Sequence, residues 1–115
     1  MLLHLQASEV LGIHPEILRC AILDDAGRVL SYSESEKGRL EDLPKDSSLM
    51  INVLVRQSLL DSLPKSLGKV KFNVVVTDKY RLVGQVLGQY TIMFALPLSI
   101  IPDEICERVI KKFGS

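Results

Sequence analysis

Hydrophobic residues near both ends of the chain recur at the spacing of amphipathic helices. Residues 2–11 predict a short helix, and Gly12 is placed to end it in a left-handed conformation. Residues 102–113 predict a second helix that begins at Pro102, where a missing N–H does no harm, with acidic residues first and basic residues last. The apolar stripe of this last helix consists of Ile105, Val109, Ile110 and Phe113.

Residues 17–32 predict the first pair of strands. Residues 17–23 form an almost unbroken apolar run, which is typical of a strand covered on both faces and therefore inside a sheet. Residues 28–32 mix polar and apolar side chains, as an edge strand does. Between them Asp24, Asp25, Ala26 and Gly27 supply turn chemistry, with Gly27 free to adopt a positive φ.

Residues 69–77, 80–87 and 90–96 predict three more strands, joined by two short turns into an antiparallel meander. The first alternates cleanly between two faces, and the last is apolar on both sides, so we expect the last to be central. Gly84 inside a strand indicates a bulge or a point of close packing. The charged, aperiodic residues 33–45 are interpreted as an exposed connection.

Residues 46–63 predict the longest helix, and its first half is apolar around most of its circumference. A single packed face cannot use all of these side chains, so we expect a second copy of the protein to supply further cover. Beside the helix, the alternating strand 69–77 offers an edge for isologous pairing. The predicted dimer interface consists of Met50, Ile51, Leu54, Val55, Lys69, Lys71, Asn73 and Val75.

An alternative keeps the helix hidden within one chain. Residues 33–45 could fold over it, with Leu40 and Leu43 as part of the cover, because apolar surface can be buried within a chain as well as between chains.

Composition narrows the function classes. Fourteen basic and fourteen acidic residues cancel, which removes the positive footprint of a nucleic-acid-binding protein and argues against attraction to anionic membranes. No apolar run reaches the roughly 18 residues of a membrane span, so we expect a cytoplasmic protein. A length of 115 residues predicts a single domain, residues 1–115.

Candidate catalytic or metal-binding groups are sparse. His4 and His14 lack partners at metal-ligand spacing, and Cys20 and Cys106 are expected to be buried, reduced thiols. Asp24 and Asp25 are better explained by the turn than as paired carboxylates. We therefore predict that the protein is not an enzyme and needs no cofactor or metal.

The order helix, two strands, helix, three strands, helix resembles the roadblock and dynein light chain domains and, more loosely, the longin and profilin-like group. The hairpin AILDDAGRVL carries the best local match, with apolar residues, a short polar turn ending in Gly27, and apolar residues again. The later stretch LGKVKFNVVVTDKYRLVGQVLGQYTIMFALP is also similar to small archaeal proteins.

We therefore predict an α/β (α+β) fold of order αββαβββα, with a five-stranded antiparallel sheet in the order 2-1-5-4-3. The long helix would lie on one face and the two terminal helices on the other. The resemblance implies a non-catalytic homodimer, or a heterodimer with a related roadblock-like chain. In the family the long helix and the first meander strand form the dimer seam, here residues 46–63 and 69–77, and the assembled platform often scaffolds or regulates small Ras-like GTPases.

A second hypothesis is a small-molecule sensory domain of the PAS or GAF kind. It would need a cavity between sheet and helix lined by a few aimed polar groups, to which Tyr32, Tyr80 and Tyr90 could contribute.

Overall fold

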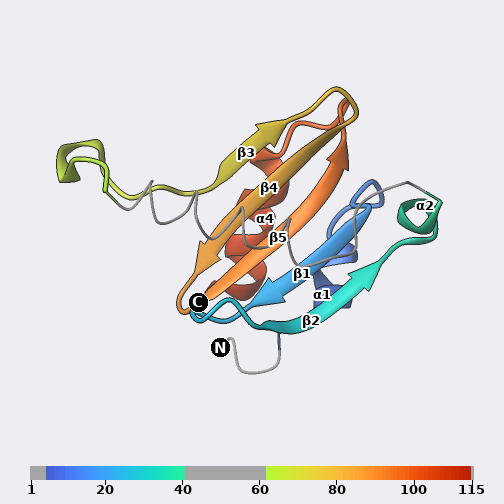
Figure 1. The fold of residues 1–115 in the computed structure, drawn as a ribbon, viewed down its shortest axis with the longest axis horizontal. Coiled ribbons are helices and arrows are strands. Elements are labelled where there is room, and N and C mark those ends of the chain that lie inside the picture. Colours follow the sequence, from blue (N-terminus) through green and yellow to red (C-terminus); the bar gives the residue numbers. More distant parts are fainter. Residues whose placement is uncertain (1–4, 41–61, 115) are drawn as a thin grey trace.

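The computed structural model describes residues 5–40 and 62–114, which form a sheet with helices packed on it (Figure 1). The elements follow one another as α1 (Ala7–Leu11), β1 (Arg19–Leu23), β2 (Val29–Glu34), α2 (Glu36–Arg39), the 3₁₀ turn η1 (Lys65–Leu67), β3 (Asn73–Val76), β4 (Tyr80–Leu87), β5 (Tyr90–Pro97) and α4 (Asp103–Phe113).

The five strands form one antiparallel sheet in the order β2-β1-β5-β4-β3. The predicted strand order is therefore confirmed, including the central places of the two strands that are apolar on both sides. The hairpin turn is also as predicted, because Gly27 has a φ of 84°. This topology leaves β2 and β3 as the two edges of the sheet among the described residues (Figure 1).

The two terminal helices pack on the same face of the sheet, as predicted (Figure 1). Their buried residues join alternate residues of the strands in the main core, which comprises Ala7, Val10, Ile17, Cys20, Ile22, Val83, Leu87, Ile92, Phe94, Leu96, Ile105, Cys106, Val109 and Phe113. The predicted long helix over residues 46–63 lies outside the described residues, except that Ser62 and Leu63 are in a turn rather than in a helix.

The N-terminal helix is shorter than predicted. It begins at Ala7, and the prediction of a left-handed Gly12 is wrong, because Gly12 has a φ of −68°. The N–H of Gly12 donates to the carbonyl of Ser8, so the glycine extends the helical turn instead of reversing it.

Residues 33–45 are not simply a connection. β2 continues to Glu34, and the short helix α2 follows at Glu36–Arg39. The hydroxyl of Ser35 accepts a hydrogen bond from the N–H of Gly38 at 2.9 Å, which caps the helix. Periodicity could not reveal a helix of a single turn.

Two further predictions need correction. Only Asn73–Val76 of the strand predicted over residues 69–77 pairs with β4. In α4, Cys106 is buried in place of the predicted Ile110, which is 38% exposed. The helix therefore turns a slightly different stripe toward the sheet than its most apolar residues suggest.

Candidate interaction surface

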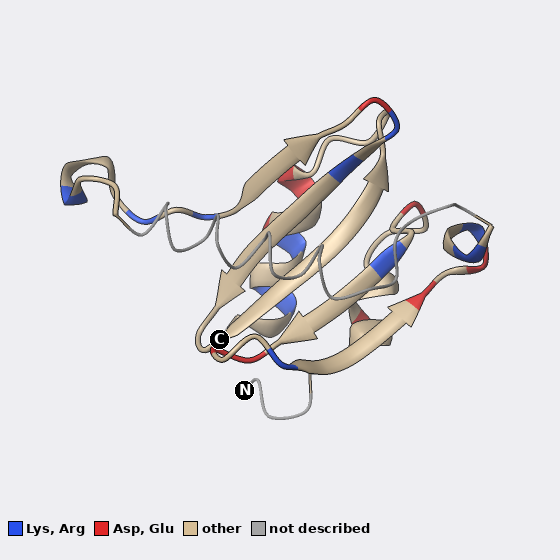
Figure 2. Ribbon diagram, in the orientation of Figure 1, with Lys and Arg blue, Asp and Glu red and all other residues tan. Residues whose placement is uncertain are grey.

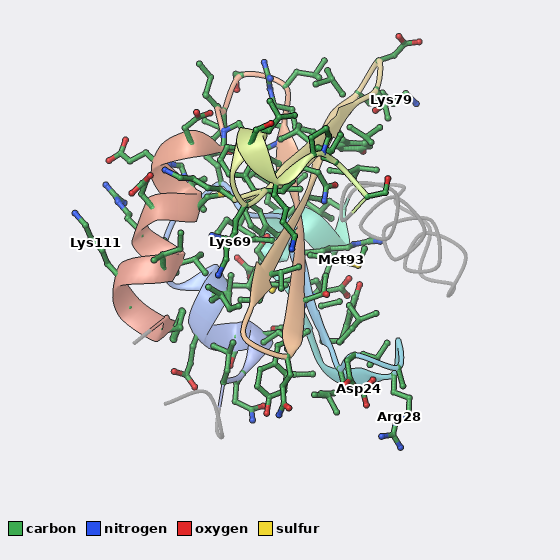
Figure 3. All side chains as sticks on the ribbon, turned by 90° about the vertical axis from the view of Figure 1, so that its left-hand side faces the viewer. Asp24, Arg28, Lys69, Lys79, Met93 and Lys111 are labelled. Carbon is green, nitrogen blue, oxygen red and sulfur yellow. The ribbon has the colours of Figure 1, made fainter. Side chains whose placement is uncertain are left out.

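The second face of the sheet, opposite α1 and α4, is built largely from small and apolar residues. Alternation along the strands places Ala21, Met93 and Gly84 on this face, and the strand pairing aligns them as neighbours in one row. Met93 points away from α4 (Figure 3). All three residues are buried. Gly84 pairs with Asn73 and Met93 without a register shift, which excludes the predicted alternative of a bulge at this position.

A buried ion pair anchors one side of this face. Arg19 is 6% exposed, and its Nε lies 3.3 Å from Oε2 of Glu34. Its Nη2 donates to the carbonyl of Gly38 at 3.2 Å, which ties α2 to the sheet. Because burying a charge without partners costs free energy, we infer that Arg19 holds Glu34 and Gly38 in position. The sequence offered a signal for it, since Arg19 is the one charge within residues 17–23.

The candidate seam residues of the β3 edge lie along the open side of the sheet. Lys69 and Lys71 are exposed and precede the strand, while Asn73 and Val75 are half-buried within it and pair with Gly84 and Leu82. Asn73 and Val75 thus lie on the β3 edge of the sheet, and Lys69 and Lys71 lie in the segment that leads into it (Figure 1). The other predicted interface residues, Met50, Ile51, Leu54 and Val55, lie outside the described residues.

Leu40 contributes little to intrachain cover, because its side chain is 89% exposed. This observation weakens the alternative in which residues 33–45 hide the long helix.

The carboxylate of Asp24 and the imidazole of His14 each take part in local hydrogen bonds with the backbone. Asp24 accepts hydrogen bonds from the backbone N–H groups of Arg28 and Ala26, at 2.9 and 3.0 Å. The Arg28 N–H is the largest cause of a lowered pKa of Asp24. His14 accepts a hydrogen bond at Nδ1 from the N–H of Glu16 at 3.0 Å, and His4 lies outside the described residues.

The two cysteines are free and buried, as predicted. Burial raises the pKa of the Cys106 thiol to about 12 and raises that of Cys20 as well. Such thiols are poor nucleophiles and poor metal ligands at neutral pH. Over residues 5–40 and 62–114, no group of three His, Cys, Asp or Glu side chains is placed to hold a metal ion.

The three tyrosines do not converge on one cavity. Tyr80 packs with Leu18 on the second face of the sheet, whereas Tyr90 packs against the core under α1 and α4. Tyr32 is 43% exposed at the β2 edge. This arrangement does not favour the sensory-domain hypothesis.

A hollow of about 340 Å³ beside α4 is lined by Ile13, Arg108, Lys111 and Lys112. Arg108 donates hydrogen bonds there to the carbonyl of Ile13 at 3.3 Å and to the carboxylate of Glu104 at 2.7 Å. The lysines lie in the last turn of the helix, where they complement its dipole.

No helix in the described part of the chain has the length and apolar character needed to cross a bilayer.

No family model and no curated protein matches the sequence. Solved structures of roadblock-fold proteins do match the structure. A structure of MglB with a tetrameric arrangement superposes with a TM-score of 0.73 at 16% identity, over 95% of this chain and 79% of that one. The roadblock/LC7 domain from Streptomyces avermitilis gives 0.69 at 15% identity, over 91% and 86%. The gliding protein MglB from Thermus thermophilus gives 0.71 at 14% identity, over 92% and 80%.

These similarities extend over nearly the whole chain. At such low identity they establish the fold, and they confirm at that level the resemblance to roadblock domains.

Proposed function

We propose that this protein is a non-catalytic dimerisation and scaffold module, in which two copies join their sheets along β3 and the assembled platform binds a small Ras-like GTPase. The observation that carries the proposal is the open β3 edge, which continues into a sheet face rich in small apolar residues, within a fold shared with roadblock proteins. A similar protein, MglB, has a structure with a tetrameric arrangement, so self-association occurs on this fold.

Charge limits the registers that the proposed pairing can take. Two β3 edges related by a two-fold axis at Asn73 would place Lys71 opposite Val75 of the second copy. An axis at residue 70 would instead place Lys69 opposite Lys71, and like charges directly opposite each other are destabilising. We propose the register centred on Asn73, the first residue of β3, which avoids this repulsion.

The dimer is tested by size-exclusion chromatography with light scattering on three proteins. Wild type should elute with the mass of two chains. Val75→Lys should elute as a folded monomer, because the new ammonium would lie opposite Lys71 of the second copy, and like charges directly opposite each other are destabilising. Ile101→Lys serves as the matched control, since Ile101 is 65% exposed and lies between β5 and α4 rather than on an edge strand, and it should remain dimeric. A dimeric Val75→Lys would exclude β3 as the seam.

GTPase binding needs a separate experiment. Immobilised wild-type protein is exposed to a Ras-like GTPase from the same genome, loaded with GDP or with a non-hydrolysable GTP analogue. A platform that recognises the switch segments should prefer one nucleotide state, because the γ-phosphate orders those segments. Equal binding of both states, or none, would contradict the GTPase part of the proposal and leave the dimer result standing.

A further inference from the structure

The β2 edge differs in chemistry from the β3 edge. β2 exposes three large apolar side chains, with Val29 46%, Leu30 53% and Tyr32 43% exposed. Its one charged residue is Glu34 at its end, as Figure 2 shows. Lysines and other charges are the usual protection of a sheet edge against pairing with other chains. The chain has such protection before β3, at Lys69 and Lys71, and lacks it on β2.

Hydrogen bonds to β1 and to α1 hold β2 in place, so its outer edge presents its backbone groups in a fixed position. Five of its six residues pair with β1, from Arg19↔Glu34 to Leu23↔Val29, and the register shifts once, at Leu30, between the pairs Ile22↔Ser31 and Leu23↔Val29. The hydroxyl of Ser31 accepts the N–H of Ala7 at 2.8 Å, which fastens the start of α1 beneath the strand. A rigid strand with an open outer edge can accept a further strand at little conformational cost to itself.

We propose that β2 is a second docking edge, which binds an extended segment of a partner protein by strand addition. The segment would be about six residues long, with apolar side chains at alternate positions beside Leu30 and Tyr32. This interface is distinct from the β3 seam and does not depend on it.

The area of the edge favours a peptide over a second folded copy. A six-residue strand spans roughly 20 Å, and a sheet occupies about 10 Å between packed layers, so its edge offers on the order of 200 Å² per partner. Stable complexes between folded proteins need about 800 Å² per partner. Two domains meeting at their β2 edges alone would fall well short of this, whereas a flexible segment forms the weak, exchangeable contact that such an area supports. The proposed β3 seam differs, because the interface predicted there also includes Met50, Ile51, Leu54 and Val55.

Charges at the two ends of β2 suggest the direction of the segment. The side chain of Arg28, just before the strand, is 81% exposed although its Nε lies 2.8 Å from Oδ2 of Asp24, and Glu36, just after the strand, is exposed as well. An antiparallel segment that begins with a basic residue and ends with an acidic one would place each charge beside its opposite.

The probe is the capped peptide acetyl-Lys-Thr-Val-Thr-Val-Thr-Val-Glu-amide, titrated into the full-length protein and followed by NMR and amide hydrogen exchange. We expect shift changes and slowed exchange confined to residues 29–34. Leu30→Lys should weaken the affinity about tenfold, because it gives the edge the protection it lacks. Ile101→Lys, at a more exposed apolar site, should bind as wild type does.

A second peptide, N-methylated at its six central amides, keeps the side chains and loses the backbone donors. It should not bind, since strand addition rests on main-chain hydrogen bonds. Equal binding of the two peptides, protection outside β2, or a Leu30→Lys variant with unchanged affinity would overturn the proposal. Self-association of the wild type that Leu30→Lys abolishes would overturn it too, by assigning the edge to a second copy.

Discussion

Gly38 is the residue at which the backbone of α2 comes closest to the sheet. A Cβ built on Gly38 would lie 1.9 Å from the carbonyl oxygen of Leu18, which is backbone and cannot move aside cheaply. No pattern in the sequence indicates this contact, because it depends on how a single helical turn lands beside the start of β1. Its hydrogen-bonding partners, Ser35 and Arg19, are recognisable only once the chain has folded back.

We expect Gly38→Ala to lower the free energy of unfolding by about 2–3 kcal/mol, since the added methyl must displace α2. The control is Gly12→Ala, because Gly12 has a helical φ and its nearest contact for a Cβ is 3.3 Å. This control should change stability by less than about 1 kcal/mol. Urea denaturation measures both, and a Gly38→Ala variant as stable as wild type would show that α2 is not packed as described.

We predict that the free energy of unfolding falls at alkaline pH because the thiol of Cys106 is buried. The pKa of Cys106 is about 12 in the folded protein, against an ordinary value of 9.0. Between these two values the unfolded chain loses a proton that the native protein keeps, so the free energy of unfolding falls as the pH rises. The slope from one such thiol is about 1.4 kcal/mol per pH unit.

Urea titrations of wild type and Cys106→Ala between pH 8 and pH 11 test this. The difference in stability between the two proteins should shrink steadily above pH 9, because the variant lacks the titrating thiol. A constant difference across this range would mean that Cys106 is accessible to solvent in the native state.

At the scale of elements, the sequence predicted strands better than it predicted their ends. β4 matches the predicted residues 80–87 at both ends, because turns flank it and it pairs on both sides. β3 is shorter than the alternating pattern of residues 69–77, since alternation records which face a side chain takes and not whether its backbone is paired. Phe72 illustrates this, because it packs against the core from outside the strand.

The proposed register of the β3 seam predicts a specific cross-link. With a two-fold axis at Asn73, an Asn73→Cys variant would bring two copies of the new thiol face to face, at a Cα separation suited to a disulfide. Mild oxidation should therefore produce a covalent dimer on a non-reducing gel. Val76→Cys, three residues away on the same strand, is the control and should cross-link far less. Equal cross-linking of both variants would rule out the register centred on Asn73.

At the scale of the whole molecule, the strand order and the placing of the terminal helices followed from the sequence. The nearly unbroken apolar runs 17–23 and 90–96 marked the two central strands, which left few possible positions for the other three strands. The proposed interaction surfaces followed from the sequence less completely. Asn73 and Val75 lie on the β3 edge and Lys69 and Lys71 in the segment that leads into it, but the pattern of residues 28–32 predicts no more than an ordinary edge strand.

The sequence pattern did not reveal which strand side chains are exposed to solvent. Val29, Leu30 and Tyr32 are common strand residues, and the pattern of residues 28–32 cannot tell whether they face a core or solvent. Only the completed sheet shows that these side chains lie at its open border.

Sedimentation equilibrium of the unmodified protein tests the central claim of self-association most directly. Over about 1–100 μM, a range that brackets ordinary interface affinities, the account predicts a mass that rises to twice the 12.8 kDa of one chain. A mass of 12.8 kDa throughout that range would contradict it.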